Sequence, residues 1–197
     1  MAAGFGLIIG YAEIVAVRAE TYAFDKAHSR IIFFVPHEGL SQFLGQFHTF
    51  DGEIEFDPAK PEAGRVTVTI DAASVDMDHQ ELNERLRGKD FFRVNEFPTL
   101  TFNSTSVVRT GEKTGKLTGN LTLMGITKPV TLDVTLNYSG PHPFYKIPTL
   151  GLSATGLIDR KDFGLTYRPE FIGDDITIRL EIEAMEKSKI PAAALRK

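Results

Sequence analysis

Metal or nucleophilic catalysis requires histidine, cysteine or carboxylate side chains at defined spacings, and this chain offers few of them. Its five histidines lie at positions 28, 37, 48, 79 and 142. They show no HExxH spacing, and the chain contains no cysteine, so thiol catalysis and cysteine-ligated metals are excluded. We therefore expect isolated histidines at turns or strand ends, with no metal site and no catalytic residue.

Three short segments resemble parts of known motifs but lack the remainder. The segment "DMDHQELNE" (76–84) lacks the sixth-position glycine of a calcium-binding EF-hand loop and is typical of a helix start. "GLSAT" (151–155) lacks the last glycine of a G-x-S-x-G nucleophile elbow. "DFGL" (162–165) occurs without the glycine-rich loop, lysine and HRD segment of a kinase. No cofactor is predicted.

Composition indicates one globular domain without nucleic-acid partners. The chain has 197 residues, of which 42% are hydrophobic, and this length can bury a sizeable core. Its formal net charge is −4, and lysines and arginines are scattered. Nucleic-acid binding requires clustered cations, so this class of partner is excluded.

The first 19 residues are predicted to be an export signal. An apolar run ends in Val17-Arg18-Ala19, which fits the small-x-small pattern of a cleavage site. Because no lysine or arginine precedes the run, an ordinary helix or tail is the alternative. The run is interrupted by Glu13 and is too short to span a bilayer, so no integral membrane segment is expected in the mature chain.

Apolar and polar residues alternate along most of the chain, as in "LTLMGITKPVTLDVTL" (121–136). Side chains on a strand point alternately to opposite faces, so this pattern predicts strands with one apolar face. The 121–136 segment is predicted to be a hairpin interrupted at 124–129. The predicted strands cover residues 29–37, 42–56, 65–72, 99–109, 115–124, 129–139, 150–159 and 175–186.

One short helix is predicted over 78–88, with Asp78 as N-cap and Gly88 at its end. Its apolar stripe contains only Leu82 and Leu86, so it caps a sheet rather than covering one. The strands must therefore bury their apolar faces against one another, in a sandwich or in a closed barrel. Alternation alone does not distinguish the two.

Strand number and local irregularities favour a closed barrel. The inward phase shifts by one residue between Phe47 and Phe50, which predicts a β-bulge near His48. An eight-stranded barrel either fills with its own side chains or holds one small ligand. Small residues on the inward phase, namely Gly119, Ala154 and Gly156, are expected to leave room for a ligand.

Ordered motifs over residues 22–186 resemble the YceI-like, polyisoprenoid-binding family. The segment "YAFDKAHSRIIFFVPH" is similar to that family's opening pattern Y-x-x-D-x-x-H-S followed by alternating apolar residues. The similarity continues through "VTVTIDAASVD", "LRGKDFFRVNEFPTLTFNST", "KLTGNLTLMGITKPVTLDV", "ATGLIDRKDFGL" and "IGDDITIRLEIEA". Five further ordered blocks are far more specific than one short motif.

This resemblance implies an all-β fold: an extended eight-stranded antiparallel lipocalin-like barrel with one short capping helix. It also implies a periplasmic, exported protein that holds a long-chain isoprenoid in the barrel, and a possible homodimer. The barrel domain is then expected over 20–188, with a C-terminal tail at 189–197. Many relatives have arginine at positions 44 and 46, where this chain has Leu44 and Gln46. This difference predicts an uncharged or weakly polar head group.

The function predicted on this basis is non-covalent binding, transport or storage of a polyprenyl- or quinone-type lipid. The predicted lining is Phe33, Val35, Phe47, Ile54, Phe56, Val68, Phe102, Leu121, Leu123, Leu132, Val134, Leu152, Ala154, Ile178 and Leu180, with Leu82, Leu86, Phe91 and Phe92 closing one end. His37, Arg160 and Arg168 are the head-group candidates. The alternatives are a lipid- or quinone-modifying enzyme, a fatty acid- or amide-binding protein, and an interaction module with a solid core.

Overall fold

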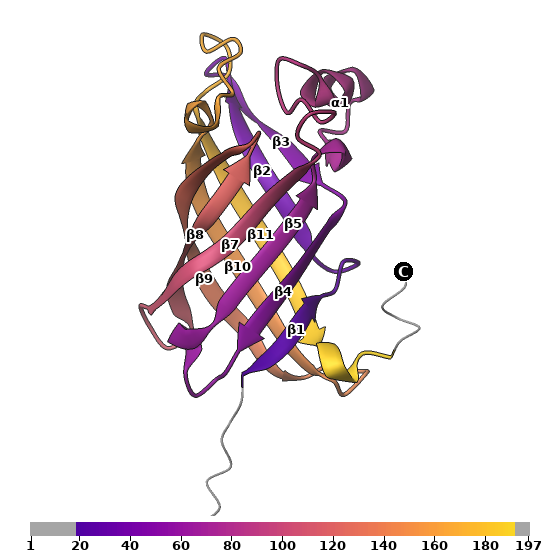
Figure 1. Ribbon diagram of the computed structural model, residues 1–197, viewed down its shortest axis with the longest axis vertical. Coiled ribbons are helices and arrows are strands. Elements are labelled where there is room, and N and C mark those ends of the chain that lie inside the picture. Colours follow the sequence, from indigo (N-terminus) through magenta and orange to yellow (C-terminus); the bar gives the residue numbers. More distant parts are fainter. Residues whose placement is uncertain (1–18, 192–197) are drawn as a thin grey trace, which may run out of the picture.

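The alternating segments assemble into one antiparallel sheet that closes on itself, in a computed structural model that describes residues 19–191 (Figure 1). The strands are β1 (Glu20–Phe24), β2 (Arg30–His37), β3 (Ser41–Phe47), β4 (Phe50–Phe56), β5 (Arg65–Asp71), β6 (Val75–Asp76), β7 (Thr99–Arg109), β8 (Thr114–Leu123), β9 (Ile126–Pro141), β10 (Pro148–Asp159) and β11 (Asp175–Glu186). Pairing of β1 with β11 closes the sheet. The predicted closed barrel is confirmed.

The eleven strands of the described residues form an eight-stranded barrel, because three strands of the barrel wall are each interrupted and counted as two. β1 and β2 pair with successive parts of β11. On their other side, β1 pairs with β4 and β2 pairs with β3. β6 continues β5 and pairs with β3. The predicted phase change near His48 is present, but it is a break between β3 and β4 rather than a bulge within one strand. The short strands β1 and β6 were not predicted from the sequence.

The break between β1 and β2 explains the D-x-x-H-S part of the opening motif. Asp25 Oδ1 accepts a hydrogen bond from the backbone N–H of Ala27 at 3.0 Å, and Asp25 Oδ2 lies 2.8 Å from His28 Nδ1. Ser29, which is fully buried, accepts a hydrogen bond from the Glu183 N–H and donates one to the Glu183 carbonyl. The Ser29 hydroxyl thereby replaces two backbone groups in the ladder with β11.

The connection between β8 and β9 is shorter than predicted. β8 ends at Leu123 and β9 begins at Ile126, so only Met124 and Gly125 form the turn. Both residues have positive φ, 50° and 73°, as a two-residue hairpin turn requires. Thr127 and Lys128, expected in the connection, lie within β9 instead. The connection between the strands predicted over 129–139 and 150–159 is likewise shorter, because β9 continues to Pro141 and β10 starts at Pro148.

The one α-helix within residues 19–191, α1 (Gln80–Arg87), is held against the barrel by Asp76 at the end of β6. The carboxylate of Asp76 accepts hydrogen bonds from the Asn83 amide at 2.6 Å and the Asp78 N–H at 2.9 Å. It also lies 2.8 Å from His48 Nε2. The predicted N-cap was wrong by one residue: Asp78 has a φ of 56°, and His79 caps the Leu82 N–H.

Acid is expected to loosen this attachment. Hydrogen bonds from His48, Asn83 and the Asp78 N–H lower the pKa of Asp76 to about 2. A carboxyl group with a depressed pKa stabilises the fold above its ordinary pKa, and that contribution disappears as the pH falls from about 5 to about 2. Urea unfolding should therefore show that the free energy of unfolding falls less between pH 6 and pH 3 for Asp76→Asn than for the unchanged protein. An equal loss in both would contradict this role for Asp76.

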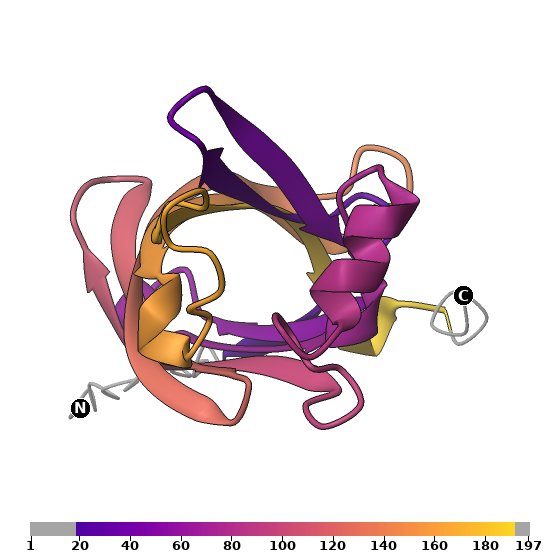
Figure 2. The ribbon, with the colours of Figure 1, turned by 90° about the horizontal axis from the view of Figure 1, so that it is seen from above.

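Different turns and segments lie at the two ends of the barrel (Figure 1). The upper end carries the β2–β3 turn, α1 with the following residues 88–98, and the 160–174 segment between β10 and β11. The lower end carries the β7–β8 and β9–β10 turns. Viewed from above, α1 and the 160–174 segment lie at opposite sides of the barrel opening (Figure 2). No helix in residues 19–191 has the length and apolar character needed to span a membrane.

Candidate functional site

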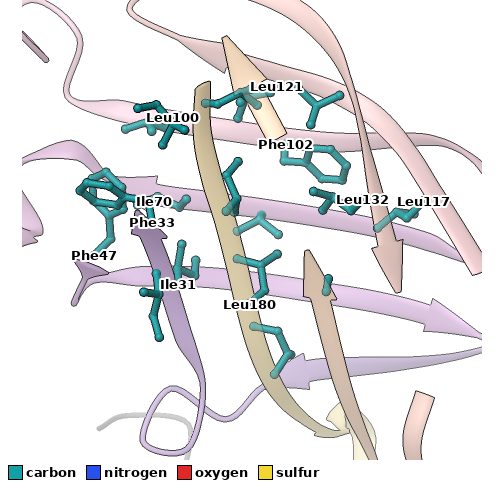
Figure 3. A pocket seen from close by; sticks show the side chains of 18 of the residues that line it. Ile31, Phe33, Phe47, Ile70, Leu100, Phe102, Leu117, Leu121, Leu132 and Leu180 are labelled. Atoms are coloured by element: carbon teal, nitrogen blue, oxygen red, sulfur yellow. The ribbon is translucent and has the colours of Figure 1, made fainter. Parts of the chain in front are cut away.

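The inward faces of the strands surround a cavity of about 730 Å³ that is lined almost entirely by apolar side chains. Figure 3 shows side chains from strands on different sides of the barrel, including Phe33, Leu121 and Leu180, directed into the same space. The volume lies within the range of about 300–1,000 Å³ usual for pockets that enclose one small molecule. The alternative of a solid core is therefore wrong.

Every residue predicted for the lining lies on the wall of this cavity. These residues are Phe33, Val35, Phe47, Ile54, Phe56, Val68, Leu82, Leu86, Phe91, Phe92, Phe102, Leu121, Leu123, Leu132, Val134, Leu152, Ala154, Ile178 and Leu180. Their contact with a ligand stays a prediction. Further lining residues were missed, among them Ile31, Ile70, Leu100 and Leu117 (Figure 3). The same period-two alternation would have identified all four.

The cavity stays open because phenyl rings lie flat against glycines of the wall. A Cβ atom at Gly45 would lie 2.2 Å from Cζ of Phe33, the residue directly opposite on β2. The ring of Phe102 covers Gly119 in the same way, since a Cβ there would lie 2.3 Å from the ring. Aromatic rings thus occupy the space above the glycines instead of the barrel axis.

This arrangement corrects the expected role of the small inward residues. Gly119 leaves no room for a ligand next to itself, because the Phe102 ring fills that space. The space at Gly156 is likewise taken by the side chain of Leu132, its partner on β9. Glycines enlarge the cavity indirectly, by letting large neighbours lie along the wall.

Aromatic side chains continue from the wall to the upper end. The rings of Phe33 and Phe47 lie 5.5 Å apart, and that of Phe92 lies 5.7 Å from Phe47. Phe91 contacts Tyr167 edge to face at 5.3 Å, which joins the segment after α1 to the 160–174 segment. Leu82, Leu86, Phe91 and Phe92 therefore lie at one end of the cavity, as predicted, and all four are half-buried.

Arg160 does not fit the role of a head-group ligand. Its side chain is buried, and it donates to the carbonyl oxygens of Leu165, Tyr167, Ile172 and Gly173. Its Nη2 also lies 3.2 Å from Asp174 Oδ1. These partners engage all of its nitrogens, so Arg160 shapes the 160–174 segment. Asp159 caps the start of this segment, and Phe163 is buried within it.

His37 and Arg168 are placed differently at the upper end. The His37 ring stacks on Phe43 at a centroid distance of 4.4 Å, at the rim of the cavity. Arg168 is exposed and lines the opening, with its guanidinium 5.6 Å from the ring of Tyr167 and 5.6 Å from that of Phe171. Its Nε donates to the Tyr167 hydroxyl at 3.1 Å.

Titratable side chains of the lining gather at the two ends of the cavity. Besides those named above, Glu38 and Arg85 belong to the upper end. The lower end has Glu55, Arg65, Arg109, Glu112, Lys113 and Lys116, a group that the sequence analysis missed. These residues sit at strand ends and in turns, where alternation gives no signal. Between the two ends, the lining formed by the described residues is hydrocarbon surface.

A second polar group lies away from the cavity, where β1 meets β2. Asp25, His28 and Glu183 bring ligand-type atoms within 4.8 Å of one another. The hydrogen bond and charge of Asp25 raise the pKa of His28. The turn geometry described above accounts for this cluster without an ion.

Comparison with known proteins agrees with the geometry. The family model described as "YceI-like domain" matches residues 22–184. A UPF0312 protein of Ectopseudomonas mendocina is 38% identical over 186 residues, covering 92% of this chain and 96% of that protein. A UPF0312 protein of Yersinia pestis is 39% identical, covering 85% and 88% of the two chains.

Solved structures share the barrel. Burkholderia cenocepacia BcnA is similar with a TM-score of 0.74 and 27% identity, over 81% of this chain and 98% of that chain. The Campylobacter jejuni YCEI protein has a TM-score of 0.64 and 27% identity, over 94% of each chain. A polyisoprenoid-binding domain from Saccharophagus degradans has a TM-score of 0.65 over 84% and 98% of the two chains. At 17% sequence identity, this structural similarity shows a shared fold alone.

Proposed function

This chain belongs to the YceI-like family, and from that premise we propose that it binds a long-chain isoprenoid or related lipid of the polyprenyl or quinone type. The lipid tail lies in the barrel cavity and is held without a covalent bond. The protein carries or stores this lipid. The observation that supports the proposal is the apolar cavity of about 730 Å³, which is continuous from the upper to the lower end.

Burial of hydrocarbon supplies the binding free energy. Each methylene group moved from water into an apolar environment contributes about 0.8 kcal/mol. Association and the ordering of a flexible tail oppose this gain, so measured affinities fall well below the sum. An apolar wall without polar groups along its middle discriminates tails by length and shape, and head groups are recognised only at the ends.

An enzyme that modifies a lipid in the same cavity is the second candidate, and the geometry favours it less. Acid–base chemistry requires titratable groups within hydrogen-bonding reach of the reacting atoms. The lining contains such groups only at its ends, where Arg160 is engaged by carbonyl oxygens and Arg65 lies 3.9 Å from Glu55. A fatty acid or fatty amide would fit the same walls and is the alternative ligand class.

Location and assembly are part of the proposal. Export to the periplasm is supported by the apolar pattern of residues 1–19. Of these residues, only Ala19 belongs to the part of the chain that the structure describes. N-terminal sequencing of the mature protein is expected to start at Glu20. The homodimer stays a prediction, to be measured by sedimentation equilibrium.

Organic extraction of the purified protein, followed by mass spectrometry, tests the function directly. We expect one lipid class with a long unbranched or prenyl tail, at close to one molecule per chain. Incubation of the loaded protein should return the same lipid mass, whereas a changed mass would indicate an enzyme. Failure to recover or to rebind any lipid would overturn the proposal.

A further inference from the structure

The turn between β9 and β10, at the lower end of the barrel, exposes two adjacent aromatic rings (Figure 1). Phe144 is 85% exposed and Tyr145 is 64% exposed, more than any other phenylalanine or tyrosine in residues 19–191. Neither side chain belongs to the lining of the cavity. Single exposed apolar residues are common, but two neighbouring rings at one turn form a patch that indicates a binding surface.

Hydrogen bonds to one histidine hold these two rings in place. Nδ1 of His142 accepts from the backbone N–H groups of Phe144 at 3.1 Å and of Tyr145 at 3.3 Å. The His142 ring lies 4.7 Å from the Tyr145 ring, measured between centroids. Tyr138 braces the turn from β9, because its hydroxyl donates to the Pro141 carbonyl at 2.6 Å. The rings are therefore held in one arrangement, which lowers the entropy lost when they bind.

The backbone of this turn keeps almost no N–H group for a partner or for water. The prolines at positions 141, 143 and 148 have no N–H group. The N–H of His142 donates to the Ile147 carbonyl at 2.7 Å, and that of Lys146 donates to the His142 carbonyl at 3.0 Å. With the two bonds to the His142 ring, only the Ile147 N–H of residues 141–148 stays outside this set. Backbone donors that are already paired make entry into an apolar environment much less costly.

The charge of the turn suits an anionic surface. Lys146 is the only lysine, arginine or carboxylate residue between positions 138 and 149. Its Nζ donates to the Pro143 carbonyl at 2.7 Å, and it forms no ion pair within residues 19–191. Aromatic rings beside a lysine are typical of segments at a membrane interface, where the rings lie near the lipid tails and the ammonium group reaches the phosphates.

The size of the patch favours a bilayer over a protein partner. Two aromatic side chains can bury roughly 300–500 Å². A stable protein interface buries about 800 Å² on each partner, so the two rings fall well short of it. A lipid surface requires no matching shape, and partial insertion of a few apolar side chains is sufficient for reversible binding.

The upper end also exposes apolar side chains, but carboxylates lie beside them. Leu40 is 81% exposed and lies two residues from Glu38 in the β2–β3 turn. The exposed Phe171 directly follows Glu170. Anionic head groups would repel these carboxylates. Leu40 is therefore the matched control position at the opposite end of the barrel.

We infer that the Phe144–Tyr145 turn docks this protein on the surface of a bilayer that contains anionic phospholipid. The two rings lie among the lipid head groups, and Lys146 faces the phosphates. Ser139, which precedes the turn on β9, lines the lower end of the cavity, so docking brings that end of the barrel to the bilayer. Docking goes beyond the proposed function, which concerns the cavity alone.

A tryptophan introduced at the turn tests the location of docking, because the chain contains no other tryptophan. The vesicles contain equal parts of phosphatidylcholine and phosphatidylglycerol. Their addition should shift the fluorescence emission of Tyr145→Trp to shorter wavelength, as the indole enters the interface. Leu40→Trp should show no shift. A shift in Leu40→Trp, or no shift in either variant, would overturn the inference.

Binding of the protein to the same vesicles, measured by flotation, tests the contribution of each side chain. The double variant Phe144→Ser with Tyr145→Ser should bind about a hundredfold more weakly, since each ring returns roughly 60 Å² of apolar surface to water. Lys146→Gln should weaken binding about fivefold on these vesicles and leave binding to pure phosphatidylcholine unchanged. Unchanged vesicle binding in the double variant would overturn the inference.

Two variants of His142 test the preorganised turn. His142→Ala removes the acceptor of both N–H groups and should weaken vesicle binding about threefold or more, because the rings become mobile. His142→Asn should retain most of the binding, since an asparagine side chain accepts from the backbone two residues on. Equal binding by His142→Ala and the unchanged protein would mean that the turn needs no bracing.

The outcomes for docking and for the proposed function are distinguishable. The double variant should bind a C20 prenyl alcohol in solution with the affinity of the unchanged protein, because neither ring lines the cavity. Loss of vesicle binding with this affinity retained supports docking. Failure of the unchanged protein to bind the alcohol would reject the proposed function, while vesicle binding would still decide the inference.

Discussion

Replacing Gly45 by alanine is expected to weaken lipid binding about thirtyfold, through loss of about 2 kcal/mol of tail burial. The new methyl group would lie 2.2 Å from the Phe33 ring, so the ring must leave the wall and enter the cavity. There it displaces two or three methylene groups of the tail, at about 0.8 kcal/mol each. Displacement of a fluorescent probe by a C20 prenyl alcohol measures the change.

The double variant Gly45→Ala with Phe33→Leu is the matched control. A leucine at position 33 removes the ring atoms that the methyl group would meet, so binding should recover to within about threefold of the original. Thermal unfolding of both variants shows whether the barrel is intact. Unchanged binding in Gly45→Ala alone would mean that the ring position does not govern the cavity.

Arg160→Met is expected to lower the free energy of unfolding by about 3–5 kcal/mol, as removal of one partner from a buried ionic network does. Methionine fills a similar volume but donates no hydrogen bonds, so four carbonyl oxygens lose their donor and Asp174 keeps only its ion pair with Lys161. The affected segment forms part of the cavity opening, and lipid binding should weaken as well. Urea unfolding monitored by far-ultraviolet circular dichroism gives the stability change.

Arg179→Met provides the comparison for this result. Arg179 is an exposed arginine on β11 that pairs with Glu181 at 2.9 Å. Surface ion pairs contribute at most about 1 kcal/mol, so this variant should unfold almost as the unchanged protein does. Equal stability losses in the two variants would show that the Arg160 network has no special role.

Both predictions concern features that no single strand contains. Gly45 and Phe33 lie on different strands, and their registered pairing places a phenyl ring over a glycine. Arg160 was a head-group candidate from the sequence, but its burial and its carbonyl partners became visible only in the folded segment. Residue type indicated chemistry in both cases, and position in the fold decided its use.

The missed and displaced elements have similar causes. β1 and β6 are short, and their pairing with β11 and β3 stabilises them more than their own sequences do. The helix begins one residue later than expected because the Asp76 carboxylate caps the turn at Asp78 from outside the helix. Interactions with residues elsewhere in the chain outweighed local propensity at these sites.

The sequence by itself determined which side chains face inward and that the strands must cover one another, because period-two alternation sets the face of each residue and one short helix covers little surface. Alternation also placed each of the predicted lining residues on the inward face, where the structure has them. Only the tertiary structure decided that the barrel is hollow and where its polar groups meet. Cavity volume depends on which rings lie across which glycines of neighbouring strands, and cation positions at the rim depend on turns where alternation ends.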